Sequence, residues 1–378
     1  MTRFGFVRLI TCIAVAALAA LAAPTLGAQV QVDFPLSIDN LPSYDRVNGL
    51  TLPFGPTITF GDNERLVVSP VITYRSQLGK IDPSLSIVGQ LTSDSTLGVT
   101  VTGARGTFTN DDWMRSNLLN SLVSFGLGHD SRNYFRADRG EARLTSALHL
   151  PIDVATVFAG VRTERDWSTG WRNGSDVGPF SVFGRRDSVD GIQRPNPLID
   201  AGHITSMIAG GHAEFVGVSA SEMLDVLIEA AGKSPAGGSF QQLTISEAAV
   251  IPTYSNQRFE IGAHLVTTAT NSFTPRQRYA YVGGSGSLAT VDLLGLGGDH
   301  LYFLDALYVI PIPRIEFPLL GSPYIAPHFA SGAASVGGFG TPVQNVGGRI
   351  GLSVFTMDYL VNPRTHQHDF GVGISLRP

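Results

Sequence analysis

The stretch Asp369-Phe370-Gly371-Val372-Gly373-Ile374-Ser375-Leu376 decides the fold, because apolar residues alternate along it with small or polar ones. In an extended strand, successive side chains point to opposite faces of the sheet. This strand therefore has one wholly apolar face, which is made of Phe370, Val372, Ile374 and Leu376.

The same alternation recurs along the chain. Residues 258–265 alternate apolar with charged or small side chains, and residues 155–161 continue into the charged positions Arg162, Glu164 and Asp166. Apolar-out and polar-in alternation over about ten residues is typical of a membrane barrel strand. We count sixteen candidate strands, which begin near residues 49, 65, 83, 96, 118, 136, 153, 203, 223, 240, 257, 300, 323, 345, 356 and 369.

This pattern predicts an all-β fold, an antiparallel transmembrane β-barrel of about 16 strands, and an even number suits a bacterial single-chain barrel. Residues 113–124 and 222–233 also fit amphipathic helices, so those two strands stay open. With strand one running outward, the longest gaps, 169–202 and 271–299, fall on the outer side. The turn around residues 110–117 is then long for the periplasmic side.

The first 28 residues have the pattern of a secretory signal peptide. Arg3 and Arg8 precede an apolar run that ends at a small-residue site, Leu26-Gly27-Ala28. An N-terminal membrane anchor is the alternative. We therefore expect a signal peptide at 1–28, a short periplasmic segment at 29–44 and a barrel domain at 45–378.

The composition of the mature chain excludes several classes of protein. Cys12 is the only cysteine, so loss of the signal peptide removes disulfides, thiol catalysis and cysteine-bound metals. Loss of Arg3 and Arg8 also shifts the formal charge from −5 to −7, and an acidic chain without a basic run argues against nucleic-acid binding. An exported soluble β-protein remains the alternative to a membrane barrel.

Several segments together resemble the barrel of the bacterial surface antigen family, which contains the BamA-like outer-membrane assembly factors. Tyr44-Asp45-Arg46-Val47-Asn48-Gly49-Leu50 is similar to the family's strand-one motif, in which Tyr44, Arg46 and Gly49 stand out. Tyr281-Val282-Gly283-Gly284-Ser285-Gly286-Ser287-Leu288 is similar to the family's glycine-rich sixth outer loop. Residues 297–311 and the segments 345–355, 356–362 and 369–376 follow in the family's order.

The resemblance implies that the glycine-rich loop folds into the lumen, where the family's loop arginine pairs with acidic groups on the inner wall. Here the arginine position is Ala289, and the matching wall positions are Leu307, Val309 and, approximately, Ser331. The pairing is therefore expected to be lost on both sides, because a buried charge without its partner is costly. The lumen-loop motif is left as Gly283, Gly284, Gly286, Leu288 and Ala289.

Two further departures concern the ends of the chain. About sixteen residues at 29–44 are too few for one of the family's periplasmic POTRA domains, so we expect a barrel without them. The last strand ends Leu376-Arg377-Pro378 rather than on an aromatic residue. The face made of Phe370, Val372, Ile374 and Leu376 is then expected to act as the C-terminal insertion signal.

Two clusters invite a chemical interpretation. His366-Gln367-His368-Asp369 has the spacing of metal ligands, and His129-Asp130 with Asp111-Asp112 resembles the Asp/His pairs of outer-membrane proteases. We interpret the first as polar loop residues and the second as chance. We therefore predict no catalytic residue, metal or cofactor. Charged residues between Arg136 and Asp166 are expected to brace the inner wall rather than line a polar path.

The leading hypothesis is a non-enzymatic outer-membrane barrel in protein insertion or translocation, or a reduced relative that kept only the scaffold. The alternatives are a passive channel for small polar solutes and an outer-membrane enzyme with its site on the outer loops. The expected partners are outer-membrane lipids and lipopolysaccharide, with the barrel-assembly machinery during biogenesis. The client or solute stays open, and no nucleic acid is expected.

Overall fold

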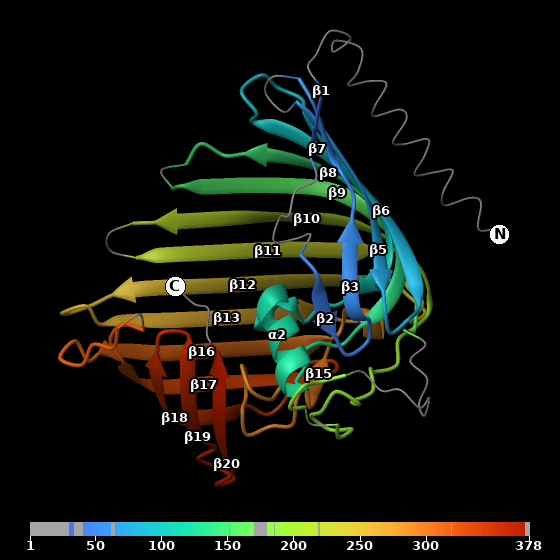
Figure 1. The fold of residues 1–378 in the computed structure, drawn as a ribbon. Coiled ribbons are helices and arrows are strands. Elements are labelled where there is room, and N and C mark those ends of the chain that lie inside the picture. Colours follow the sequence, from blue (N-terminus) through green and yellow to red (C-terminus); the bar gives the residue numbers. More distant parts are fainter. Residues whose placement is uncertain are drawn as a thin grey trace.

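The computed structural model describes residues 30–33, 41–61, 65–150, 152–169, 180–184, 186–217, 220–318 and 320–374. Within these residues, one antiparallel sheet of 18 strands curls through the whole molecule (Figure 1). Its strands are β1 (Val30–Asp33), β2 (Ser43–Asp45), β3 (Gly49–Phe54), β4 (Thr57–Phe60), β5 (Leu66–Arg75), β6 (Lys80–Gln90), β7 (Leu97–Phe108), β8 (Phe135–Ala147), β9 (Val154–Trp167), β10 (Gly202–Val216), β11 (Ser221–Ala231), β12 (Phe240–Pro252), β13 (Arg258–Thr268), β16 (His300–Pro311), β17 (Tyr324–Ser335), β18 (Val343–Leu352), β19 (Phe355–Val361) and β20 (His368–Ile374).

The remaining elements lie in the connections between these strands. A two-stranded hairpin consists of β14 (Ala280–Val282) and β15 (Leu296–Gly298). The helices are the 3-10 turns η2 (Asp112–Met114) and η3 (Arg276–Arg278) and the α-helix α2 (Asn117–Leu127). Among the described residues, none of the helices has both the length and the apolar character needed to cross a membrane.

The sheet is a meander in which chain neighbours pair, from β5 through to β20. At its start, β3 and β4 pair with consecutive parts of β5, so together they span one strand length. In the same way β1 pairs with β4 and β2 with β3. Within the described residues the sheet therefore amounts to sixteen strand lengths, and the antiparallel fold class is confirmed.

Two details of the sequence prediction are corrected. The predicted strand near residue 118 is wrong, because α2 occupies those residues between two caps. The side chain of Ser116 accepts the Leu119 N–H at the N-terminus, and Gly128 takes a left-handed conformation (φ 72°) at the C-terminus. The sixteenth strand length comes instead from β1 and β2, which lie in the segment that was expected to precede the barrel.

This correction places all three long connections at one end of the sheet. The connections 109–134, 168–201 and 269–299 follow strand lengths five, seven and eleven, counted from β1 and β2. We call this the long-loop end and the other the short-turn end. The turn around 110–117, which was predicted on the short-turn side, is thus part of a long connection, because residues 117–127 do not cross the sheet.

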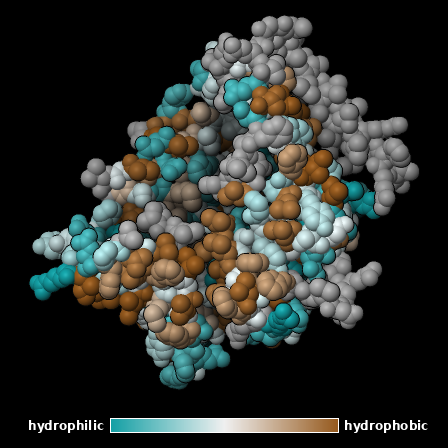
Figure 2. Space-filling model, viewed as in Figure 1, coloured by the Kyte–Doolittle hydropathy of each residue, from teal (hydrophilic) through white to brown (hydrophobic). Residues whose placement is uncertain are grey.

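The two faces of the sheet differ sharply in character. On β9, Val157 and Val161 are 41% and 54% exposed, whereas Arg162 and Glu164 are 8% and 1% exposed. On β20, the predicted apolar face points outward, with Phe370, Val372 and Ile374 exposed; Leu376 lies outside the described residues. Hydrophobic side chains cover much of the surface in Figure 2. We call the face with the buried charges the inner face; the arrangement is the reverse of a soluble protein.

The first and last strands form a seam. Among the described residues, no register pairs β20 with β1, β2 or β3, while β20 pairs with β19 along seven residues. Helix α2 lies next to β2 at the long-loop end (Figure 1). The predicted signal peptide, residues 1–28, lies outside the described residues.

Candidate functional site

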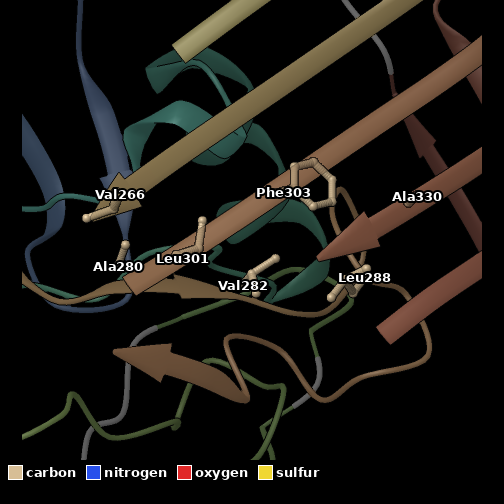
Figure 3. Packing of buried hydrophobic residues seen from close by; sticks show 7 residues of the cluster. All are labelled: Val266, Ala280, Val282, Leu288, Leu301, Phe303 and Ala330. Carbon is tan, nitrogen blue, oxygen red and sulfur yellow. The ribbon is translucent and has the colours of Figure 1, made fainter. Parts of the chain in front are cut away.

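The connection 269–299, which we call the glycine loop, packs on the inner face of β13, β16 and β17. Its side chain Leu288 is fully buried and contributes to one apolar cluster with residues of these strands (Figure 3). The buried members are Val266, Ala280, Val282, Leu288, Leu301, Phe303 and Ala330. The predicted motif residue Leu288 is thus a packing anchor for the loop.

The glycines of the predicted loop motif form a tight bend. Gly283, Gly284 and Gly286 have φ values of 134°, 83° and 97°, which lie in the region that side chains with a Cβ rarely adopt. A Cβ on Gly283 would also collide with the backbone carbonyl of Asp292. The bend lets the loop turn back on itself while it stays pressed to the inner face.

Arg278 anchors the start of the glycine loop to the inner face by charge. Its guanidinium donates to both carboxylate oxygens of Glu229 on β11, at 2.9 and 3.0 Å, and to Glu164 on β9. Arg278 is 4% exposed, Glu164 is 1% exposed and Glu229 is 3% exposed. A buried bidentate pair of this kind is strong and geometrically specific.

The anchor belongs to a larger network on the inner face. Arg139 donates to Glu164 at 2.8 Å, while Arg162 donates to Glu229 at 3.3 Å and to Glu141 at 2.7 Å. Three arginines, counting Arg278, therefore alternate with three glutamates across β8, β9 and β11. This confirms the predicted bracing of the inner wall by charged residues.

The other end of the glycine loop is held by neutral hydrogen bonds. Asn345, a fully buried residue of β18, accepts the Thr290 N–H at 3.1 Å and donates to the Thr290 hydroxyl at 2.7 Å. The loop thus contacts the inner face from β9 to β18. Ala289, the position matched to the family's arginine, makes no charged contact because it has no charged group.

The charge pairing that was expected to be lost concerns Ala289 and the wall positions Leu307, Val309 and Ser331, none of which carries a charge. Leu307 and Val309 do form an apolar cluster with Ala326 where the family has charged wall groups. Sequence reasoning missed Arg278, however, which lies eleven positions before Ala289 and supplies an arginine to different acids. The signal was the basic pair in Arg276-Gln277-Arg278 just before the glycines, together with inward glutamates on neighbouring strands.

The other two long connections pack on the glycine loop. Trp113 stacks on His264 of β13, with ring centroids 4.2 Å apart and planes nearly parallel at 7°. Arg115 donates to the Ser285 carbonyl at 2.7 Å, which joins the 109–134 connection to the loop. From the 168–201 connection, Asp200 pairs with Arg276 at 2.6 Å. The three connections form one packed unit, which we call the loop cluster.

A small cavity of about 20 Å³ lies where the three connections meet. It is lined by side chains from all of them, including Asp111, Leu198 and Tyr281. Asp111 is 1% exposed and accepts the Asn133 N–H at 2.7 Å. Burial raises the pKa of Asp111 to about 7, so this carboxyl changes its charge near neutral pH.

Of the residues compared with outer-membrane proteases, the Asp111 and Asp130 carboxylates accept hydrogen bonds from the protein. Asp130 is fully buried and accepts from Asn120 and from the Tyr134 hydroxyl, each at 3.0 Å. At the other candidate cluster, His366 and His368 lie in and after the turn from β19 to β20. Within the described part of the chain, no group of three His, Cys, Asp or Glu side chains could hold a metal ion.

The strand-one motif lies at the turn from β2 to β3 at the long-loop end. Tyr44 is in β2, and Gly49, with φ 65°, begins β3. Arg46 is 2% exposed and donates to the carbonyls of Arg132 and Arg194 at 2.9 and 2.7 Å. The motif therefore begins β3 and also links the loop cluster to the first strands through Arg46.

No model of a known family matches the chain, and no curated protein matches it. Among solved structures, BamA from Haemophilus ducreyi lacking POTRA domains 1–3 is 11% identical, with a TM-score of 0.50 over 96% of this chain and 78% of that one. CdiB from Escherichia coli is 10% identical, with a TM-score of 0.44 over 91% of this chain and 66% of that one. CdiB from Acinetobacter baumannii is 11% identical, with a TM-score of 0.43 over 92% and 64%.

At 11% identity the likeness to BamA concerns the fold, and the element order agrees with it. A meander of sixteen strand lengths carries its long connections at one end, and the connection after the eleventh packs on the inner face. This chain is therefore a β-barrel of BamA-like fold.

Proposed function

We propose that this protein is an integral outer-membrane barrel that handles polypeptides, in membrane protein insertion or translocation, rather than conducting small solutes. The apolar outer face and charged inner face support a membrane location, because lipid favours apolar side chains and an aqueous lumen favours charged ones. The BamA-like fold supports the polypeptide role. Residues 1–28 would serve as the cleaved export signal, and Phe370, Val372, Ile374 and Leu376 as the face that the barrel-assembly machinery recognises.

The observation that carries the proposal is the Arg278 anchor. In this proposal the glycine loop crosses the lumen and plugs it, held by Glu164 and Glu229 at one end and by Asn345 at the other. A buried ion pair that fixes a loop across the inner face narrows or closes the lumen. This arrangement suits a barrel that must stay closed to ions while it handles polypeptide chains.

The plug is tested by conductance in planar lipid bilayers. The wild-type protein should show low or irregular conductance. Arg278→Ala should give larger and longer conductance steps, because Glu164 and Glu229 then repel each other and release the loop. Arg276→Ala is the matched control, since Arg276 lies on the same turn but is exposed and pairs with a surface-side carboxylate. Large, steady conductance by the wild type would refute the plug and favour the channel.

The membrane location and the polypeptide role need separate tests. An integral barrel should require detergent for solubility and run faster on gels before heating than after it; a detergent-free soluble protein without this shift would not be a barrel. For the role, the full chain in phosphatidylcholine vesicles should speed the folding of a urea-unfolded eight-stranded barrel protein. Equal folding rates in protein-free vesicles would count against insertion activity.

A further inference from the structure

Helix α2 is amphipathic in the reverse sense to a helix on a soluble protein. Apart from the buried Val123, its large apolar side chains are on the outside: Leu122 is 49% and Phe125 is 44% exposed. Its polar side chains Asn120 and Ser124 are buried, at 2% and 0% exposure. A surface helix in water normally turns its apolar stripe inward, so the apolar side of α2 is suited to an apolar surrounding.

The buried polar side of α2 is fully engaged with the protein. Asn120 donates to Asp130 and accepts the Ser131 N–H, each at 3.0 Å. Ser124 donates to the His129 carbonyl at 3.3 Å. The helix is therefore fixed in this orientation by its own polar groups, and it contains no charged residue between Asn117 and Leu127.

Helix α2 also covers the edge of the first strands at the seam. Among the residues that the structure describes, β2 has a strand partner, β3, on one side only. The Tyr44 N–H of β2 donates to the Ser121 hydroxyl of α2 at 2.7 Å, in place of a strand partner. A strand edge in lipid must have its backbone groups satisfied, and a covering helix is one way to do this.

The apolar side of α2 continues into neighbouring apolar surface on both sides. The Phe125 ring packs edge-on against Tyr44 at 5.3 Å, and Tyr44 is the register partner of the exposed Leu50 on the outer face of β3. On the other side, the Phe183 N–H donates to the Gly126 carbonyl at 2.8 Å. We call the combined surface the α2 patch: Leu118, Leu122, Phe125, Phe180 and Phe183. Figure 2 shows hydrophobic surface at the place of α2.

We propose that the α2 patch lies against lipid acyl chains at the long-loop end of the seam, where α2 seals the edge of β2 in place of a closing strand. The occupant is lipid because the patch is uncharged and is continuous, through Tyr44 and Leu50, with the outer face of the barrel. This inference rests on the membrane location proposed above. It adds that one of the three long connections is a membrane-embedded part of the barrel wall.

The test is spin-label accessibility in the full chain, refolded into phosphatidylcholine vesicles in a Cys12→Ala background. Labels at Leu122→Cys and Phe125→Cys should collide with oxygen more than with a water-soluble nickel complex. Leu144→Cys, on the exposed apolar face of β8, is the lipid reference. Thr365→Cys, exposed in a turn at the same long-loop end, is the aqueous reference.

Each outcome decides the proposal. The proposal is supported if the oxygen and nickel accessibilities of labels at residues 122 and 125 match those of the label at Leu144→Cys. Values that match Thr365→Cys overturn it and place α2 in water. Low access to both reagents also overturns it, because a second copy or another protein then covers the patch. If Leu144→Cys itself has aqueous values, the membrane location fails, which is distinct from failure at α2 alone.

Discussion

The wall formed by β8 to β11 and the seam at β2 hold the same loop cluster by different contacts. At the wall, buried arginines and glutamates alternate, and Arg278 ties the glycine loop to Glu164 and Glu229. At the seam, Arg46 donates to backbone carbonyls of the loop cluster, while α2 meets β2 through the Tyr44–Ser121 hydrogen bond and apolar contacts. The contact between α2 and β2 thus contains no charged pair, unlike the anchor of the glycine loop.

This difference indicates which contact of the loop cluster is more costly to break. Breaking a buried ion pair costs about 3–5 kcal/mol, whereas one neutral hydrogen bond contributes about 1 kcal/mol. Loss of the contact between α2 and β2 should therefore cost less free energy than loss of the Arg278 anchor.

The largest expected effect comes from removal of the charged anchor. Arg278→Ala should lower the free energy of unfolding in detergent micelles by about 3–5 kcal/mol, because two buried glutamates lose their shared partner. The measurement is the urea midpoint followed by the gel mobility shift. Arg276→Ala, on the exposed side of the same turn, should change the free energy of unfolding by less than about 1 kcal/mol.

A compensated variant sharpens this result. Arg278→Met combined with Glu229→Gln removes one charge of each sign and leaves Glu164 paired with Arg139 and Arg162 paired with Glu141. Such replacements are often close to neutral, so the midpoint should return most of the way to the wild-type value. A double variant as unstable as Arg278→Ala would mean that Arg278 acts by packing, and the contrast between wall and seam would then not be one of charge.

The alternation in sequence was enough to predict the wall but not the anchor. Period-two patterns such as Val157 and Val161 against Arg162 and Glu164 identify strands and their inner faces, because one face meets lipid or solvent and the other is buried. The partner of those inward charges comes from a loop 114 positions away in the case of Glu164 and Arg278. Local patterns contain no information about such a distant contact.

The seam was harder to predict for two physical reasons. The apolar residues between 113 and 124 fit both the helical period and the strand period. Only the caps at Ser116 and Gly128 favour the helix. The first strand length is divided into β1 and β2, and each is too short to show a pattern of its own. The number of strand lengths was right, while one of the predicted strands and the start of the barrel were wrong.

The second largest effect is expected from the bend of the glycine loop. Gly283→Ala should cost about 1–3 kcal/mol, because Gly283 has φ 134° and a Cβ there meets the Asp292 backbone. The glycine loop should become more sensitive to protease while the gel mobility shift is kept. Gly338→Ala, in the turn after β17 with open space around the position and without a positive φ, is the control. Equal protease resistance in Gly283→Ala and wild type would show that the bend is not strained.

Asp111 adds a pH dependence to the loop cluster. Burial raises its pKa from 3.8 to about 7, so its stabilising effect is present at low pH and is lost as pH rises through about 7. Arg194 and Arg132 oppose this shift by their charge, and Asp112 adds to it. Between pH 6 and pH 8, the wild type should lose about 1 kcal/mol relative to Asp111→Asn, because the loss amounts to about 1.4 kcal/mol for each pH unit below the raised pKa. Parallel pH profiles in urea unfolding would contradict this assignment.

The smallest effect is expected at the seam, from Ser121→Ala. Loss of the hydrogen bond to Tyr44 costs about 1 kcal/mol, but alanine favours the helix by about 0.5 kcal/mol, so the urea midpoint should hardly move. The informative measurement is amide hydrogen exchange at Tyr44, which should speed up about fivefold or more, while conductance stays low because Arg278 still holds the plug. Ser116→Ala, which removes the N-cap of α2, should instead speed exchange throughout the helix. If Ser121→Ala also raised conductance, α2 and the glycine loop would move together, and the seam would not be independent of the wall.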